Sequence, residues 1–178
     1  YYKRVLTIHF NPNIMKTLGK LLLFVPVFAF LLLSCSKDET DALVKEEGPF
    51  KISELAGNWE ATSAYFVSDS DSNIFVDIID DGGSSTITVQ SSGRFTLTID
   101  PADRAAYTVS GDMSWEKWEG EYYFAIEWDD YPGDWDTYGA TLAATTFSIN
   151  GGFDTGEYDF DNDGSAESAR IGFEFTRV

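Results

Sequence analysis

The sequence is poor in the two side chains that serve most nucleophilic and zinc chemistry, with one cysteine, Cys35, and one histidine, His9. A single cysteine cannot form an intramolecular disulfide, so no disulfide framework is expected. His9 precedes the first methionine, Met15, and we interpret residues 1–14 as an upstream extension outside the folded protein. Beyond Cys35 there is neither thiol nor imidazole, which excludes Ser-His-Asp catalysis, Cys-His catalysis and zinc sites built on those ligands. Carboxylate chemistry and metals with oxygen ligands remain.

Basic residues are also scarce, with 12 Lys and Arg against 30 Asp and Glu and a net charge of −18. Four of the basic residues precede Cys35 and all the acidic residues follow it, so the chain beyond Cys35 carries −22. This charge opposes nucleic acid and anionic lipid surfaces, and no nucleic-acid partner is expected. A heavily solvated exterior explains the charge more simply than an acidic binding site does.

Hydrophobic runs are too short for a membrane-spanning helix. The run Leu21–Leu33 has thirteen residues and includes Pro26, whereas a spanning helix needs about 20 apolar residues. Lys16 and Lys20 supply a basic start, and Ser34 is a small residue at the position where a peptidase would cut. Residues 15–34 are therefore predicted to form a secretory signal peptide.

The end of this run, Leu32-Leu33-Ser34-Cys35, resembles the lipobox of bacterial lipoproteins. The resemblance implies that Cys35 is alkylated with diacylglycerol and becomes the mature N-terminus, so the membrane is a partner through this lipid. It also implies export and anchoring to the outer membrane of a Gram-negative bacterium. Lys37-Asp38-Glu39 resembles the surface-export signal of lipoproteins in one group of these bacteria, which implies exposure at the cell surface. A plain acidic linker is the alternative interpretation of these three residues.

Helical periodicity is almost absent from the rest of the chain. Residues 35–50 have little to bury and are expected to form a flexible acidic tether, and residues 51–178 are long enough for one domain. Apolar residues alternate with polar ones in this domain, as in Phe95, Leu97 and Ile99, which is typical of half-buried strands. Turn sequences separate segments of this kind, and eight or nine strands are expected, over residues 59–67, 73–79, 85–90, 94–100, 106–115, 121–128, 139–149, 157–160 and 167–177.

Short connections favour antiparallel neighbours, and about eight strands are enough to close a barrel with a fillable interior. We therefore predict an all-β fold, an antiparallel up-and-down β-barrel of about eight strands. A two-sheet β-sandwich requires the same alternation and stays open as the alternative.

The segment Gly57-Asn58-Trp59, at the start of the first expected strand, resembles the opening of lipocalin and calycin barrels. Together with the lipobox, the tether and the Gly93-Arg94-Phe95-Thr96 hairpin, it makes the chain resemble lipocalin-like lipoproteins of Gram-negative bacteria. The resemblance implies that Trp59 plugs one end of the barrel and that a closing arginine, Arg170 or Arg177, accompanies it. The chain has no Thr-Asp-Tyr motif, which this family pattern would include.

One loop has the sequence pattern of a calcium site. Asp159, Asp161, Asp163, Gly164 and Glu167 follow the opening spacing of a calcium loop of the EF-hand kind, in which oxygen ligands surround a hard cation. The twelfth position is an arginine and no helix pair flanks the loop, so the sequence predicts a structural calcium ion in a loop between strands. An ordinary acidic hairpin turn is the alternative.

A second acidic stretch, residues 129–138, contains several aromatic side chains that are able to stack on a sugar. Candidate ligand-binding residues here and in the preceding hairpin are Trp118, Trp135 and Tyr138, although packing on the barrel explains most such rings.

These observations predict an exported, lipid-anchored binding or structural module that is not an enzyme, with a small apolar ligand or a glycan as its partner. The alternatives are a calcium-stabilised glycan-binding accessory protein and, more distantly, a carboxylate-dependent hydrolase, because two acids about 5 to 9 Å apart suffice for glycoside hydrolysis. A roomy, partly apolar barrel interior favours small-ligand binding, and a filled one favours a structural role.

Overall fold

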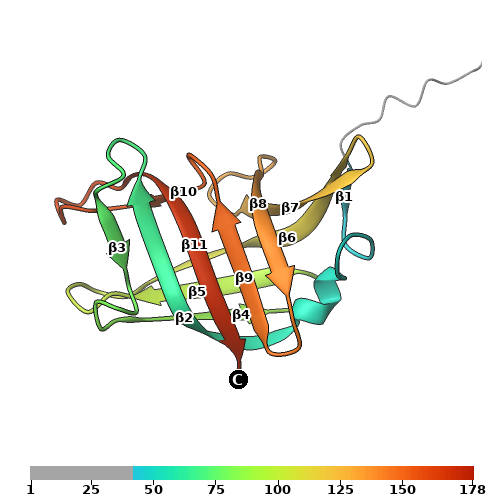
Figure 1. Cartoon of the computed structure of the whole chain (residues 1–178), viewed down its shortest axis with the longest axis horizontal. Helices are drawn as coiled ribbons and strands as arrows, with labels where there is room; N and C mark the ends of the chain where they lie inside the picture. Colours follow the sequence, from blue (N-terminus) through green and yellow to red (C-terminus); the bar gives the residue numbers. More distant parts are fainter. Residues whose placement is uncertain (1–41) are drawn as a thin grey trace, which may run out of the picture. The chain divides into compact units, whose positions relative to one another are not determined.

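The computed structural model describes residues 42–178, so the expected signal peptide, Cys35 and the first part of the expected tether lie outside the described residues. Eight antiparallel strands form a ring in which successive strands are neighbours (Figure 1). Nine residue pairs join the last of these strands to the first and close the ring, which confirms the all-β antiparallel up-and-down barrel and excludes the sandwich. The ring strands are β2 (Gly57–Ser68), β4 (Ser84–Val89), β5 (Arg94–Asp100), β6 (Tyr107–Trp118), β7 (Glu121–Trp128), β8 (Asp136–Leu142), β9 (Thr146–Gly151) and β11 (Glu167–Arg177).

In Figure 1, strands β2, β11, β9 and β8 run side by side down the near face, and β4, β5, β6 and β7 cross behind them. Polar and apolar residues alternate along the strands as expected: β4 is exposed and buried at alternate positions, and β5 buries Phe95, Leu97 and Ile99. A closed ring leaves the buried face of every strand inside the barrel, where these side chains form one core.

Three expected strands differ from those observed. The expected strand 73–79 is reduced to β3 (Phe75–Asp77) and pairs with β2 outside the ring, and the expected strand 157–160 becomes β10 (Gly156–Tyr158), which pairs with β11. The expected strand 139–149 is a hairpin, because the chain turns where the amide of Ala143 donates to the carbonyl of Thr146 at 2.8 Å. This turn lacks the Gly, Pro, Asn or Asp that marks most turns, so alternation alone did not reveal it.

The second half of the expected tether is attached to the barrel. Residues Ala42–Val44 form β1, which pairs with the part of β6 that β5 does not cover. Phe50 packs edge-on against Trp115 with ring centroids 4.9 Å apart, and its carbonyl accepts a hydrogen bond from the Trp115 indole at 2.9 Å. The contact of Phe50 with Trp115 and the pairing of β1 with β6 thus hold residues 42–50 against the barrel.

One end of the barrel is closed by a tryptophan and an arginine. Trp59 is fully buried and donates its indole N–H to the carbonyl of Leu55, in the 3-10 helix Ile52–Leu55, at 2.8 Å. The guanidinium of Arg177 lies 4.0 Å from the Trp59 ring centroid and donates to the carbonyls of Ala56 and Glu54 at 2.7 and 2.8 Å. Gly57 has φ of +138°, a conformation that other residues rarely adopt, and it lets the chain pass from the 3-10 helix into β2. The arginine at this closed end is therefore Arg177.

The barrel interior is filled near this end. Phe147 contacts both Trp59 and Phe175, with ring centroids 5.9 and 6.1 Å apart. Among the side chains around Phe95, Met113 and Phe175 only about 10 Å³ stays empty, no more than one water molecule requires. No helix among residues 42–178 is long and apolar enough to cross a membrane.

Candidate functional site

A cavity of about 410 Å³ opens at the other end of the barrel, where β5 ends, β6 begins, β7 ends and β11 begins. We call it the mouth cavity. Its deep wall consists of inward-facing side chains that the strand pattern places in the core: Phe66, Leu97, Ile99, Ile171 and Phe173. The interior is thus filled at the end that Trp59 closes and open at the mouth.

The rim of the mouth cavity comes from loops and strand ends. Tyr107 stands at the start of β6, Asp130 and Tyr131 follow β7, and Tyr158 ends β10. The surrounding side chains desolvate the Tyr107 hydroxyl, which raises its pKa above the ordinary value. The cavity therefore has an apolar floor and a rim that offers both aromatic faces and polar groups.

Arg104 is the basic residue that lines the mouth cavity. Its Nε and Nη2 atoms donate to the Asp103 carboxylate at 3.1 Å, and Nη1 donates to the carbonyl of Asp159 at 2.6 Å. The guanidinium also lies over the Tyr158 ring, 5.2 Å from its centroid. The hydrogen bond to Asp103 is the largest influence that raises the pKa of Arg104. The guanidinium of Arg104 is thus already hydrogen-bonded to Asp103 and Asp159, and it links these two parts of the rim.

A second hollow of about 280 Å³, the side chamber, adjoins the mouth cavity. The two share Trp128, Tyr131, Gly156 and Glu157 as a common wall. The remaining lining of the side chamber is polar and acidic apart from one ring: Asp134, Trp135, Asp136, Asp154 and Thr155.

The side chamber has a negative electrostatic potential. Asp136 is half-buried, and its pKa is raised above the ordinary value first by desolvation and then by the charges of Asp134 and Asp154. The pKa of the Tyr131 phenol is raised mainly by the charge of Glu157, whose carboxylate accepts its hydrogen bond at 3.3 Å. Carboxylate charge thus contributes to the raised pKa values of both Asp136 and Tyr131.

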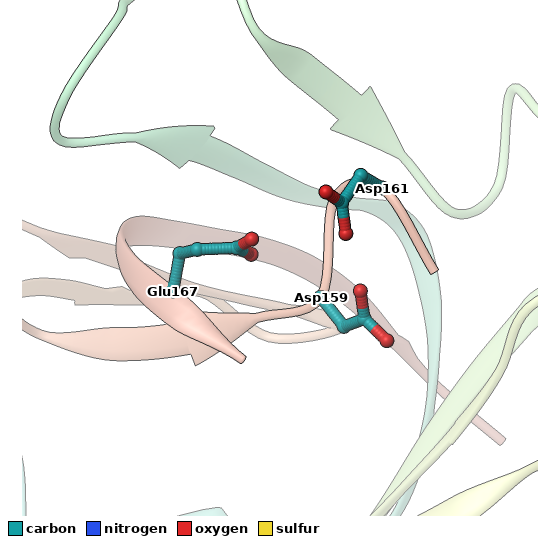
Figure 2. Close-up of side chains that lie close together, drawn as sticks. All are labelled: Asp159, Asp161 and Glu167. Atoms are coloured by element: carbon teal, nitrogen blue, oxygen red, sulfur yellow. The ribbon is translucent and has the colours of Figure 1, made fainter. Parts of the chain in front are cut away.

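The acidic loop that was expected to hold calcium lies beside the mouth cavity, which Asp159 and Gly164 help to line. Oxygen atoms of Asp159, Asp161 and Glu167 lie within 4.8 Å of one another. Figure 2 shows Asp159 and Asp161 on the loop after β10, with Glu167 extending from the start of β11. Three carboxylates at this spacing are able to supply the oxygen ligands of a metal ion.

Asp163, the fourth expected ligand, is not part of this cluster. Its carboxylate accepts the amide of Ser165 at 2.8 Å, while its own amide donates to Asp159 and Asp161 at 3.1 and 3.2 Å. Asn162 and Gly164 on either side adopt positive φ angles of 60° and 94°. These turns direct the Asp163 carboxylate into the loop backbone.

The three aromatic candidates lie apart. Trp118 is half exposed at the end of β6 and contacts Tyr123. The register of β6 and β7 places it seven residues along the strand from the mouth residue Trp128, roughly 23 Å at about 3.3 Å per residue. Trp135 lines the side chamber. Tyr138 is buried, donating its hydroxyl to the carbonyl of Thr155 at 2.7 Å and accepting the Trp128 indole at 3.2 Å, so it supports the chamber wall from behind.

Sequence reasoning missed the residues that form the mouth cavity, above all Ile99, Arg104 and Tyr107. A usable indication was present, because alternate connections of an up-and-down barrel lie at the same end. Residues near the ends of β5 and β7 and the starts of β6 and β11 therefore had to meet.

Comparison of the chain with protein-family models, curated proteins and solved structures gives no match.

Proposed function

We propose that the protein is an exported, lipid-anchored binding module of the lipocalin-like type that holds a small, largely apolar ligand in the mouth cavity. The observation that carries this proposal is the cavity of about 410 Å³ with an apolar floor, above a barrel base that is filled. Ligand pockets of proteins typically enclose about 300 to 1,000 Å³, with apolar walls and a few polar groups. A barrel with a purely structural role has no need of an opening of this size at one end.

The proposed anchor depends on Cys35 and the lipobox that precedes it. Two or three acyl chains on the mature N-terminus would hold the barrel permanently at a bilayer, since each buried methylene contributes about 0.8 kcal/mol. Residues 36–41 would separate this lipid from β1, the first strand of residues 42–178. Mass spectrometry of the mature N-terminus tests the anchor: diacylglyceryl-Cys35 supports it, and a chain that retains Met15 or an unmodified Cys35 refutes it.

The binding role is tested with a neutral, environment-sensitive dye such as Nile red, whose binding does not depend on protein charge. We expect saturable fluorescence enhancement with the natural sequence. Val109→Trp and Ala166→Trp place large rings in the mouth cavity and should weaken dye binding about tenfold or more, because the rings occupy the volume in which the dye would bury its apolar surface.

Leu142→Trp is the matched control, since Leu142 is a half-buried core residue at the end of β8, on the closed side of the barrel. Ala166 is exposed, so a ring at this position fills the opening without repacking the core. Absence of saturable binding by the natural sequence, or equal binding by the mouth variants and the control, would contradict a ligand site in the cavity.

We also propose that the acidic loop holds a structural calcium ion. The observation that favours this is the convergence of Asp159, Asp161 and Glu167 to within 4.8 Å, although their like charges repel one another. Calcium prefers six to eight oxygen ligands, so water or backbone carbonyls would complete the set. An ion at this position would stabilise the loop that forms one side of the mouth.

Calcium titration of metal-free protein should raise the melting temperature by several degrees at saturation, because the ion binds only the folded loop. Asp161→Asn should reduce that rise, whereas Asp80→Asn, an equal charge change in an exposed turn, should preserve it. A melting temperature that calcium leaves unchanged, or that magnesium raises equally, would end this proposal.

A further inference from the structure

The charge around the two chambers is one-sided. Their combined lining contains one basic residue, Arg104, which already binds the Asp103 carboxylate and the Asp159 carbonyl. The acidic residues that line one chamber or the other are Asp130, Asp134, Asp136, Asp154, Glu157 and Asp159.

Most of these carboxylates have no cationic partner. Among residues 42–178, ion pairs involve Asp159 but none of Asp134, Asp136, Asp154 and Glu157. The pKa of half-buried Asp136 is raised first by desolvation and then by the charges of Asp134 and Asp154. A cation in the side chamber would lie near these four carboxylates, of which Asp136 is half-buried and the other three are exposed.

The aromatic side chains of the side chamber also favour a cationic ligand. Trp128, Tyr131 and Trp135 line the side chamber together with the carboxylates. The faces of such rings attract ammonium groups, and the attraction increases when the cation is desolvated. Aromatic faces combined with carboxylates suit an organic ammonium better than a small, strongly hydrated metal ion.

We propose that the ligand is a cationic amphiphile, with its apolar tail in the mouth cavity and its ammonium group in the side chamber. This inference depends on the proposed binding function and assigns the ligand class to that site. The common wall of Trp128, Tyr131, Gly156 and Glu157 lies where the tail would meet the head. A carboxylate head is disfavoured, because Arg104 is already engaged and the acids near it would repel a second anion.

The test compares three probes with a ten-carbon backbone, namely decyltrimethylammonium, decanol and decanoate, as competitors for bound Nile red below their micelle-forming concentrations. We expect the ammonium to bind about tenfold more tightly than the alcohol, a difference of about 1.4 kcal/mol that lies within the range of cation–π contacts. Decanoate should be the weakest. Added salt should reduce the advantage of the ammonium and leave decanol binding nearly unchanged.

Glu157→Gln removes one charge from the shared wall and should weaken ammonium binding several-fold without affecting decanol. Asp134→Asn, at an exposed position of the side chamber, is a second variant that leaves the Tyr131 hydrogen bond intact. Glu121→Gln, at the far β6–β7 hairpin, carries the same charge change as Glu157→Gln and serves as the control.

The outcomes separate this inference from the proposed function. If decanol or decanoate binds as tightly as the ammonium, or if Glu121→Gln weakens ammonium binding as much as Glu157→Gln, the ammonium assignment is wrong while the apolar cavity still binds a ligand. If neither the dye nor any of the three probes binds saturably, the binding function itself is wrong.

Discussion

Asp77 shows how a single carboxylate can organise a turn in this barrel. It is almost fully buried, and its carboxylate accepts the Ser63 hydroxyl at 2.7 Å and the backbone amides of Ile79 and Ala64 at 2.9 and 3.3 Å. Desolvation opposes its ionisation, but these hydrogen bonds outweigh it and hold the pKa below the ordinary value of 3.8. The charged form is therefore the one that the fold stabilises.

Asp77→Asn should lower the free energy of unfolding at pH 7 by about 1 to 3 kcal/mol, because the hydrogen bonds from Ser63 and the amides lose a charged acceptor. A group with a depressed folded pKa contributes stability above its unfolded pKa and loses it as pH falls through the folded value. The difference between the natural sequence and Asp77→Asn should thus be largest at neutral pH and shrink below about pH 4.

Urea unfolding at pH 7 and at pH 2.5 measures this difference at both ends of the range. Asp80→Asn changes an exposed acid in the same turn and should have little effect at either pH. A destabilisation by Asp77→Asn that is equally large at pH 2.5 would show that the side chain acts by shape and not by charge.

At the level of elements, the ring of Phe50 packs the segment that contains β1 against the barrel. Phe50 lies within 6.4 Å, centroid to centroid, of the rings of Trp115, Phe124 and Phe147, and residues 45–49 connect it to the strand that pairs with β6. The strand itself contributes only three paired residues. Phe50 therefore fixes where residues 42–50 join the barrel.

Phe50→Ala should lower the free energy of unfolding by about 2 to 4 kcal/mol through the lost aromatic packing. It should also release β1, so that hydrogen exchange of amides in residues 115–117 becomes faster while that of β5 is unchanged. Phe153→Ala removes the same side chain from an exposed site and should leave both measurements near those of the natural sequence. Slow exchange at 115–117 in Phe50→Ala would mean that pairing alone holds β1.

The sequence predicted the elements best where alternation ends in strong turn residues. The bounds expected for residues 94–100, 121–128 and 167–177 agree with β5, β7 and β11. The hairpin at Ala143 escaped prediction because its turn is formed by residues with no turn preference, and β1 escaped because pairing with β6 does not appear in local composition. The first error concerns a turn that residue preferences do not indicate, and the second concerns pairing between strands that are distant in sequence.

The candidate site was less predictable than the fold. Alternation identifies which side chains face the interior, but the empty volume depends on how side chains from several strands fit together. The acidic loop was recognised from its spacing, yet positive φ angles at Asn162 and Gly164 turn Asp163 away from the other carboxylates. Local backbone geometry of this kind is not encoded in a spacing pattern.

For the whole molecule, charge is the property that most distinguishes this barrel. Each Lys and Arg of residues 42–178 other than Arg177 already forms an ion pair, and Arg177 is bound to backbone carbonyls. The many remaining carboxylates repel one another across the surface. Exposed ion pairs contribute little each, so screening by salt should remove more repulsion than attraction.

We therefore expect the melting temperature of metal-free protein in EDTA to rise by about 3 to 8 °C between roughly 10 mM and 0.5 M NaCl, over which the screening length falls from about 30 Å to a few ångströms. Glu60→Lys combined with Glu174→Lys, two exposed positions on β2 and β11, should raise the melting temperature at low salt and reduce the response to salt. A melting temperature that falls as salt is added would show that the ion pairs outweigh the repulsion. The acidic mouth would then be a local concentration of charge, and the unpaired carboxylates of the side chamber would stand out from a surface that is otherwise balanced.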